Sequence, residues 1–406
     1  MFRLFVVITF ILSAVYAYQM VKRLTSYILF KVLYWSLVLC GLFYFVFIVA
    51  VNVREVLDNP KKSIDFAIFF AFYIFLLSSS FIMFIEDIGR VLTLQFKKSK
   101  RGIKKKDSRR KFMSKLALGA GALPFSGLIY GVFLGRYNFK AYDYTLFFDD
   151  LPPAFDGYKI VHISDFHCGG LDNRGKVEYA VDLIKQQKGD IILFTGDFVD
   201  EKSSEINEWK SLFSSLKAKD GKFSILGNHD YGHYFRWNSP QEKEEDFEQL
   251  KSLQKEMGFD LLLDENRLIT RKGQRLCLIG VEYWGNSEPK EKGDLEMAIE
   301  GIHDDDFKIL MSHDPDHWRH VVLNHKKHFQ LTLAGHTHGF QFGLEIPGKF
   351  RWTPIRSPFK YWVGMYKEYG QYLNVNRGFG YTGFPARIGI WPEVSVITLK
   401  NNNIKK

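Results

Sequence analysis

The chain has 406 residues, a net charge of +10 and 16% aromatic residues, including 38 Phe. This length suits two or three structural units. The excess positive charge is concentrated in one segment rather than spread over a surface, so nucleic acid is not expected as a partner. The three cysteines, Cys40, Cys168 and Cys277, lie too far apart in the sequence to form a disulfide framework.

Four apolar runs precede residue 136 and predict a transmembrane region over residues 1–135. They cover residues 4–18, 32–51, 66–85 and 116–135. The last three runs are 20 residues each, which is enough to cross a bilayer as helices. The first run is shorter and follows Arg3, so a signal peptide is an alternative there. We favour a spanning helix because three more spans follow.

The basic residues predict how these spans are oriented. Segment 97–111 holds ten Lys or Arg and one Asp, so it is expected to be a loop that stays on the cytoplasmic side. Lys22 and Arg23 agree with this orientation. The loop between the second and third spans has balanced charge from Arg54, Glu55, Asp58, Lys61 and Lys62. The predicted location is therefore the cell membrane, multi-pass, with everything after residue 136 on the extracytoplasmic side.

Residues 108–113 (Ser-Arg-Arg-Lys-Phe-Met) precede a run of small apolar residues and resemble a twin-arginine export signal. The alternative is an ordinary positive-inside anchor. Both interpretations place the rest of the chain on the same side of the membrane.

Residues 136–149 are expected to be a linker, and residues 150–400 a soluble α/β domain. Strands are predicted at 159–164, 190–194, 223–226, 261–263, 267–270, 275–281, 307–311, 329–333, 371–376 and 394–399. Helices are predicted at 176–187, 205–216, 241–257 and 294–302. The strand–helix alternation over residues 159–226 is typical of a parallel, layered α/β unit.

Polar side chains follow five of these strands. They are Asp165 and His167, then Asp197, then Asn228 and His229, then His313, then His336 and His338. Because parallel strands gather their carboxyl ends on one edge, these residues are expected to meet. Imidazoles mixed with carboxylates favour Mn, Fe or Zn over Mg or Ca. The ligands are too many for one tetrahedral ion, so two divalent ions are predicted, with Asp197 as the bridge.

The motifs Asp-x-His, Gly-Asp-x-x-Asp, Gly-Asn-His-Asp, a lone His after a strand, and Gly-His-x-His occur in this order. Over residues 150–400 they resemble the calcineurin-like metallophosphoesterase superfamily. The resemblance implies a four-layer β-sandwich flanked by helices, here preceded by a bundle of about four transmembrane helices. It also implies hydrolysis of phosphoesters at a dinuclear metal site.

The resemblance assigns a role to each motif residue. Asp165, His167 and His338 would hold the first metal, Asn228, His313 and His336 the second, and Asp197 would join them. His229 would be the general acid near the leaving group, and Asp200 the carboxylate that orients it. Two adjacent cations would lower the pKa of a shared water, so that a bridging hydroxide attacks the phosphorus, and would neutralise charge developing on the phosphoryl group. An imidazole can then protonate the leaving oxygen.

Several residues near these motifs are open to two interpretations. Phe340 stands where relatives often have glycine, and Cys168 is either a spectator or a ligand for a soft ion. Segments 231–237 and 350–364 combine aromatic and basic residues, as in loop packing, an interfacial surface or a pocket for an acylated phosphate. The candidates for phosphate contact are Arg351, Arg356, Arg377 and Arg387.

The function predicted is a membrane-anchored, metal-dependent phosphoric ester hydrolase. Its expected partners are the lipid bilayer and a phosphoester substrate, which could be lipid-linked. One alternative is a lipid-linked nucleotide pyrophosphatase of envelope biosynthesis, which would need a cytoplasmic site. Another is a catalytically silent membrane sensor or scaffold, although such proteins typically lose at least one ligand and this chain retains the set.

Overall fold

The computed structural model describes residues 2–50, 60–96, 103–285, 287, 292–346, 349–355 and 359–404. The chain divides into an N-terminal unit, Met1–Phe133, and a C-terminal unit, Leu134–Lys406. Arg54, Glu55, Asp58 and Arg356, and the first part of the basic segment 97–111, lie outside the described residues.

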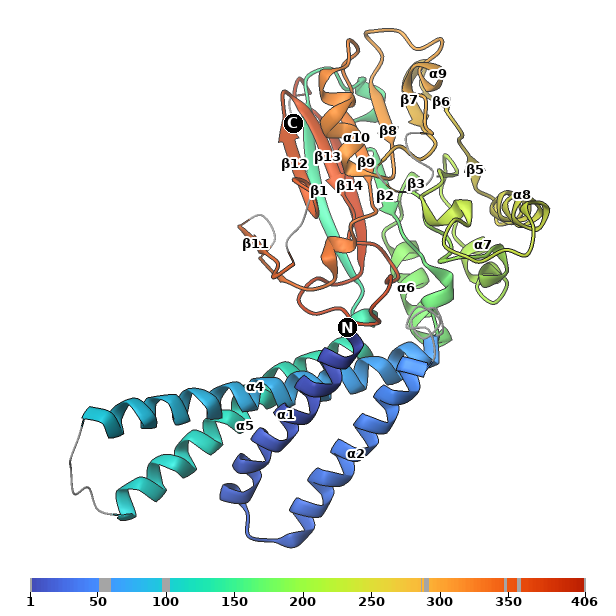
Figure 1. The fold of residues 1–406 in the computed structure, drawn as a ribbon. Helices are drawn as coiled ribbons and strands as arrows, with labels where there is room; N and C mark the ends of the chain where they lie inside the picture. The colour runs from blue at the N-terminus through green and yellow to red at the C-terminus, as the bar shows by residue number, and fades with distance from the viewer. Residues whose placement is uncertain are drawn as a thin grey trace. The chain divides into compact units, whose positions relative to one another are not determined.

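The N-terminal unit consists of long apolar helices (Figure 1). They are α1 (Phe2–Leu24), α2 (Ile28–Ala50), α4 (Pro60–Phe96) and α5 (Ile103–Phe133). Four stretches are long and apolar enough to cross a membrane: Leu4–Leu24, Ile28–Ile48, Ser63–Leu92 and Ser108–Tyr137. The prediction of four spans is confirmed, and each helix begins before the apolar run that predicted it.

Helix α1 packs into this bundle. Phe10, Ala14 and Ala17 of α1 share a buried cluster with Val38 of α2 and Leu76 of α4. This packing is what a spanning helix requires. Helix α5 starts inside the basic segment that was expected to be a loop, because Lys and Arg are good helix formers.

The C-terminal unit is built on two six-stranded sheets. The first sheet contains β1 (Lys140–Phe148), β14 (Glu393–Asn401), β2 (Lys159–Ile163), β3 (Ile191–Phe194), β4 (Lys222–Ser224) and β5 (Asp260–Leu261), in that order. The second contains β12 (Gly364–Glu368), β13 (Gln371–Val375), β9 (Leu331–Ala334), β8 (Lys308–Met311), β7 (Gln274–Gly280) and β6 (Glu265–Arg271). Strands β10 (Leu344–Ile346) and β11 (Phe350–Trp352) form a separate antiparallel pair.

Helices cover the outer faces of both sheets, which gives four layers. They are α6 (Arg174–Gln186), α7 (Lys210–Ser214), α8 (Pro240–Glu256), α9 (Leu295–Ala298) and α10 (Pro315–His320). Between the sheets, Ile160 and Leu193 pack in one cluster with Leu278, Ile309 and Leu331. The outer face of the first sheet packs on α6, α7 and α8, and that of the second on α9 and α10. The predicted α/β sandwich flanked by helices is confirmed.

The structure differs from the sequence prediction at residues 136–149, which were expected to be a linker. Residues 140–148 form strand β1, which pairs in parallel with β14 over its whole length. Much of this edge strand is half-buried or exposed, so apolar and polar residues alternate only weakly along it. The sequence therefore gave little indication of a strand. Strands β10, β11 and β12 and helix α10 were not predicted either, and the helix expected at 205–216 is a 3-10 turn followed by α7.

Candidate metal centre

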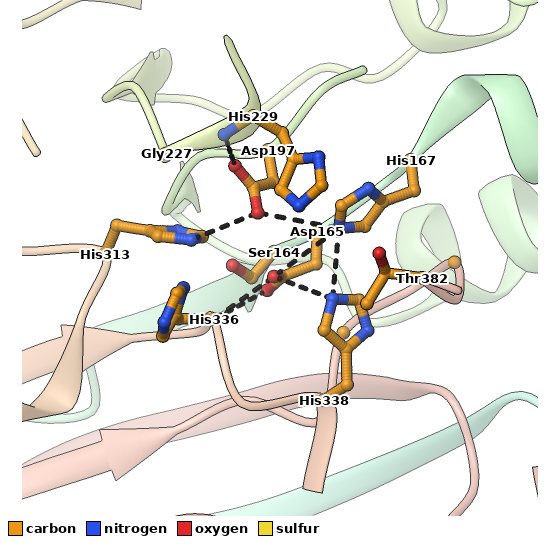
Figure 2. A network of polar contacts seen from close by, with 12 residues as sticks. Ser164, Asp165, His167, Asp197, Gly227, His229, His313, His336, His338 and Thr382 are labelled. Atoms are coloured by element: carbon orange, nitrogen blue, oxygen red, sulfur yellow. Dashed lines mark hydrogen bonds and ion pairs between the residues drawn. The ribbon is translucent and has the colours of Figure 1, made fainter. Parts of the chain in front are cut away.

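Segments that follow β2, β3, β4, β8 and β9 converge at one point of the C-terminal unit (Figure 2). Strands β2, β3 and β4 are parallel neighbours, as are β8 and β9, so their carboxyl ends lie together. These segments carry the residues that sequence analysis assigned as ligands, namely Asp165, His167, Asp197, Asn228, His313, His336 and His338. The expected meeting of the strand ends is therefore observed.

Asp165, His167 and His338 form one cluster of potential ligands. Their ligand atoms all lie within 4.8 Å of one another, and all three residues are buried. His338 Nε2 is 3.2 Å from Asp165 Oδ1 and 3.0 Å from His167 Nε2. One carboxylate and two imidazoles in this arrangement can hold a divalent transition-metal ion.

Asp197, His313 and His336 form a second cluster, again within 4.8 Å. Asp197 Oδ2 lies 3.2 Å from His313 Nε2 and 3.5 Å from His167 Nε2 of the first cluster. Asp197 Oδ1 accepts a hydrogen bond from the His229 backbone N–H at 2.9 Å. One oxygen of Asp197 thus faces both clusters.

A buried atom at this point, Asn228 Oδ1, has no hydrogen-bond partner. The other polar atom of this side chain, Nδ2, donates to Tyr234 Oη at 2.9 Å. Buried polar atoms are rarely left unpaired. His313 Nε2 lies 3.2 Å from the Asp197 carboxylate, and its Nδ1 lies 2.6 Å from the carbonyl oxygen of Thr195. An amide oxygen and an imidazole nitrogen both ligate cations, so the residues present fit a divalent metal ion.

The backbone is strained at five of the seven residues assigned as ligands. Asp165, His167, Asp197, His336 and His338 all have φ between 45° and 68°, in the left-handed region that side-chain-bearing residues seldom adopt. Such strain persists only where the surrounding structure enforces it, and it clusters at functional sites.

Glycines in the motifs leave room for the carboxylates. A Cβ on Gly335 would lie 2.2 Å from Asp165 Oδ2, and one on Gly227 would lie 2.2 Å from Asp197 Oδ1. Both distances are far below van der Waals contact, so larger residues there would displace the two carboxylates.

Asp230 holds the strand-end loops together, and sequence analysis gave it no role. Its Oδ2 accepts from the backbone N–H groups of Asp197 (2.8 Å) and Gly227 (2.9 Å), and its Oδ1 accepts from Phe198 (2.8 Å). Burial and the neighbouring charge of Asp197 raise the pKa of Asp230 to about 7. The only sequence signal was its place at the end of Gly-Asn-His-Asp.

The imidazoles keep Asp197 ionised. Burial alone would raise the pKa of Asp197, but His313 and His229 outweigh it and hold that pKa well below its usual value. Burial opposes protonation of His313, and the carboxylate of Asp197 reverses this, raising the His313 pKa to about 9. A bound cation would replace such protons, so metal affinity should rise with pH.

The structure corrects the predicted pairing of Asp200 with His229. The Asp200 carboxylate lies 3.0 Å from His167 Nδ1, not against His229. His229 Nδ1 instead lies 2.7 Å from the backbone carbonyl oxygen of Asp200, which can only accept. The reason is the turn after β3, which directs the side chain and the carbonyl of Asp200 to different imidazoles. Asp200 thus orients a potential ligand with its side chain and His229 with its backbone.

Three of the four arginines named as candidates for phosphate contact have structural partners. Arg377 is buried in ion pairs with two carboxylates, and Arg387 is buried against backbone carbonyl groups. Arg351 donates to the Val363 carbonyl oxygen at 2.6 Å. Arg356 lies outside the described residues, so the structure gives it no position.

Three further residues lie close to the motifs. His162 of β2 is fully buried, and its two ring nitrogens contact Asn374 Oδ1 and Thr195 Oγ1, as is typical of a structural histidine. Cys168 belongs to none of the potential ligand groups found among the described residues. Phe340 has φ of 56°, a conformation that favours glycine, the residue that the resemblance led us to expect here.

Comparisons with known proteins agree with this geometry. A family model described as a probable calcineurin-like phosphoesterase transmembrane domain matches residues 1–136, and the calcineurin-like phosphoesterase model matches residues 158–340. The uncharacterized metallophosphoesterase YkuE of Bacillus subtilis is 30% identical, over 74% of this chain and 100% of its own length. An uncharacterized metallophosphoesterase of Helicobacter pylori is 26% identical over 82% of this chain and 81% of its own. A transmembrane protein with metallophosphoesterase domain from Danio rerio is 27% identical over 67% of this chain and 60% of its own.

Proposed function

Because this chain belongs to the calcineurin-like metallophosphoesterases, we propose that it hydrolyses phosphoester bonds at a dinuclear metal centre. It is also a multi-pass membrane protein. The observation that carries the proposal is the position of Asp197 Oδ2 between two clusters of potential ligands. The buried and unpaired Asn228 Oδ1 supports the same proposal.

Members of this family bind divalent metal ions, and the ligand set indicates which residues would hold them. In our proposal Asp165, His167 and His338 hold one ion, Asn228, His313 and His336 hold the other, and Asp197 is shared. The imidazole-rich set favours Mn, Fe or Zn. When bound, two such ions would activate water and neutralise charge on the phosphoryl group.

His229 is proposed as the residue that protonates the leaving oxygen. Its Nδ1 faces an acceptor-only carbonyl, so Nδ1 carries a proton and Nε2 is the atom that can take up or release one. Its backbone N–H also fixes Asp197. Asp200 has a different role, because its carboxylate contacts Nδ1 of the proposed metal ligand His167. This contact sets the tautomer of the His167 imidazole and raises its basicity as a ligand.

We propose that the catalytic domain lies on the extracytoplasmic side of the membrane. The support is the excess of Lys and Arg over residues 97–111, together with Lys22 and Arg23 at the end of α1. An intact ligand set argues against a catalytically silent scaffold. A cytoplasmic domain would instead favour the alternative of a lipid-linked nucleotide pyrophosphatase.

The test uses the full-length protein purified in detergent and stripped of metal. We expect hydrolysis of p-nitrophenyl phosphate or bis-p-nitrophenyl phosphate to return on adding Mn²⁺, Zn²⁺ or Fe²⁺. Asp197→Asn should abolish the activity and lower the number of ions bound per chain, measured by elemental analysis. The matched control is Asp182→Asn, which changes an exposed carboxylate on α6.

Metal-independent hydrolysis, or full activity of Asp197→Asn, would contradict the proposal. Metal binding to the unaltered protein without hydrolysis of any phosphoester would instead support the scaffold alternative.

A further inference from the structure

The β10–β11 hairpin exposes a row of large apolar side chains. Leu344, Ile346, Phe350 and Trp352 have exposed fractions of 60, 57, 52 and 50%. In the strand register Leu344 lies opposite Trp352, and Ile346 lies opposite Phe350. Side chains two apart on a strand share a face, so all four form one surface, which we call the apolar face of the hairpin.

The charged residues of the two strands lie on the other face of the hairpin. Glu345 and Arg351 are cross-strand partners. Glu345 accepts a hydrogen bond from Arg377 Nε at 2.9 Å and pairs with Arg351, whose Nη1 donates to the Val363 carbonyl oxygen. These contacts anchor the hairpin to the rest of the domain through its polar side.

This arrangement inverts the usual pattern of a water-exposed hairpin, in which apolar residues face the domain and charges face water. Other large apolar side chains exposed on the described part of the domain, such as Tyr179, Leu268 and Met297, occur on separate elements. Isolated apolar residues on a surface are ordinary, whereas a contiguous apolar patch marks an interaction site. A two-stranded hairpin is also marginally stable by itself, so exposing its apolar side in water is costly.

We propose that the apolar face of the hairpin inserts into the interface of a phospholipid bilayer. The chain itself supplies the reason, because the last apolar helix ends at Phe133 and β1 begins at Lys140, which tethers the domain to a membrane. Trp and Phe beside aliphatic residues suit the boundary between headgroups and acyl chains. Two strands of three residues are too small for the interface of a stable protein dimer.

The hairpin is linked to the candidate metal centre both along the chain and through the contact of Glu345 with Arg377. Strand β10 begins shortly after His338, and Arg377, which holds Glu345, precedes Gly378, which packs on Asp165. Docking of the hairpin would therefore bring the centre to the headgroup region. This consequence rests on the proposed function, and it names phosphoesters of membrane lipid headgroups as the substrate class.

The test measures lipid contact and not activity, so it can fail independently of the proposed function. Full-length Cys40→Ser protein carrying Ile346→Cys is labelled with an environment-sensitive fluorophore; Cys168 and Cys277 are buried and should not react. The protein is placed in phosphatidylcholine–phosphatidylglycerol nanodiscs with or without lipids spin-labelled on the acyl chain. We expect a blue shift of the emission and a loss of intensity with the spin-labelled lipid.

The matched control is Leu268→Cys, an equally exposed aliphatic position (51%) on β6, which Figure 1 shows far from β11 within the same domain. A second variant, Phe350→Cys with Leu344→Glu, should be quenched less than Phe350→Cys alone. Equal quenching at residues 346 and 268 would overturn the proposal. A blue shift that depends on protein density but not on spin-labelled lipid would also overturn it, because a second copy of the chain would then cover the face.

Discussion

At the scale of single residues, the candidate centre depends on which atom of a side chain faces which partner. Asp200 illustrates this best. Its carboxylate lies 3.0 Å from His167 Nδ1, while its backbone carbonyl oxygen lies 2.7 Å from His229 Nδ1. A residue identified by its carboxylate therefore acts on His229 through an atom that every amino acid possesses. Mutations can consequently distinguish the role of His167 from the role of His229.

Asp200→Asn should leave His229 in place, because the backbone carbonyl is retained. It removes the charge beside His167, so we expect metal affinity to fall by about 10–100-fold. His229→Ala should instead slow hydrolysis by about 10²–10⁴-fold for poor leaving groups and much less for p-nitrophenolate. Activity as a function of metal concentration and of leaving-group pKa distinguishes the two effects.

Two results would contradict these roles of Asp200 and His229. If Asp200→Asn changed the dependence of the rate on leaving-group pKa as His229→Ala does, the Asp200 carboxylate would act on the leaving group. Its contact with His167 would then not describe the working enzyme. Loss of activity in His229→Ala that is equal for all leaving groups would remove the proton-donor role.

At the scale of elements, the centre is built from loops at strand ends, and their backbone is held by a buried carboxylate. Asp230 accepts N–H groups from the loop after β3 and from the one after β4. Asp197 there has φ of 61°, a strained conformation that needs such support. The rigid strands fix where the loops start, and Asp230 fixes how they turn.

Asp230→Asn should weaken this support. The amide nitrogen of Asn cannot accept, so either the N–H groups of Asp197 and Gly227 or the N–H group of Phe198 lose their partner, at a cost of about 1–3 kcal/mol for each. We expect a lower thermal midpoint of the full-length protein in detergent and weaker metal binding. Asp182→Asn on exposed α6 is the control, and unchanged stability and metal affinity in Asp230→Asn would show that the loops are held by other contacts.

At the scale of the whole molecule, membrane helices and a phosphoesterase domain share one chain. The positive-inside rule ties the side of the domain to the basic segment that begins at Lys97. The side decides which phosphoesters the centre can meet, because nucleotide-linked lipid precursors are expected in the cytoplasm and headgroup esters on either face.

We expect Tyr369→Cys in Cys40→Ser protein to react with a membrane-impermeant maleimide in sealed cells. Residue 369 is 82% exposed on the catalytic domain. Lys111→Cys, in the basic segment, should react only after permeabilisation. The reverse pattern would place the catalytic domain in the cytoplasm and favour the nucleotide pyrophosphatase alternative.

Sequence analysis predicted the helices of the membrane unit, most of the strands of the sandwich and the convergence of the motif residues. These succeed because hydropathy and strand-end motifs are local properties of the chain. Strand β1 was taken for a linker because its pairing with β14 joins residues 140–148 to residues 393–401, far away in the sequence. Asp230 was overlooked because its partners are backbone N–H groups, which leave no trace in side-chain spacing.

The sequence by itself determined the spans, the order of the metal-ligand motifs and the glycines that accompany them, since each depends on residue type and short spacing. Only the tertiary structure decided that Asp200 faces His167, that Arg377 and Arg387 are buried structural residues, and that the β10–β11 hairpin turns its charges inward. These outcomes depend on which distant segments pack together. The physical reason is that a buried charge must be paired or hydrogen-bonded, and the fold decides which groups lie within hydrogen-bonding distance of it.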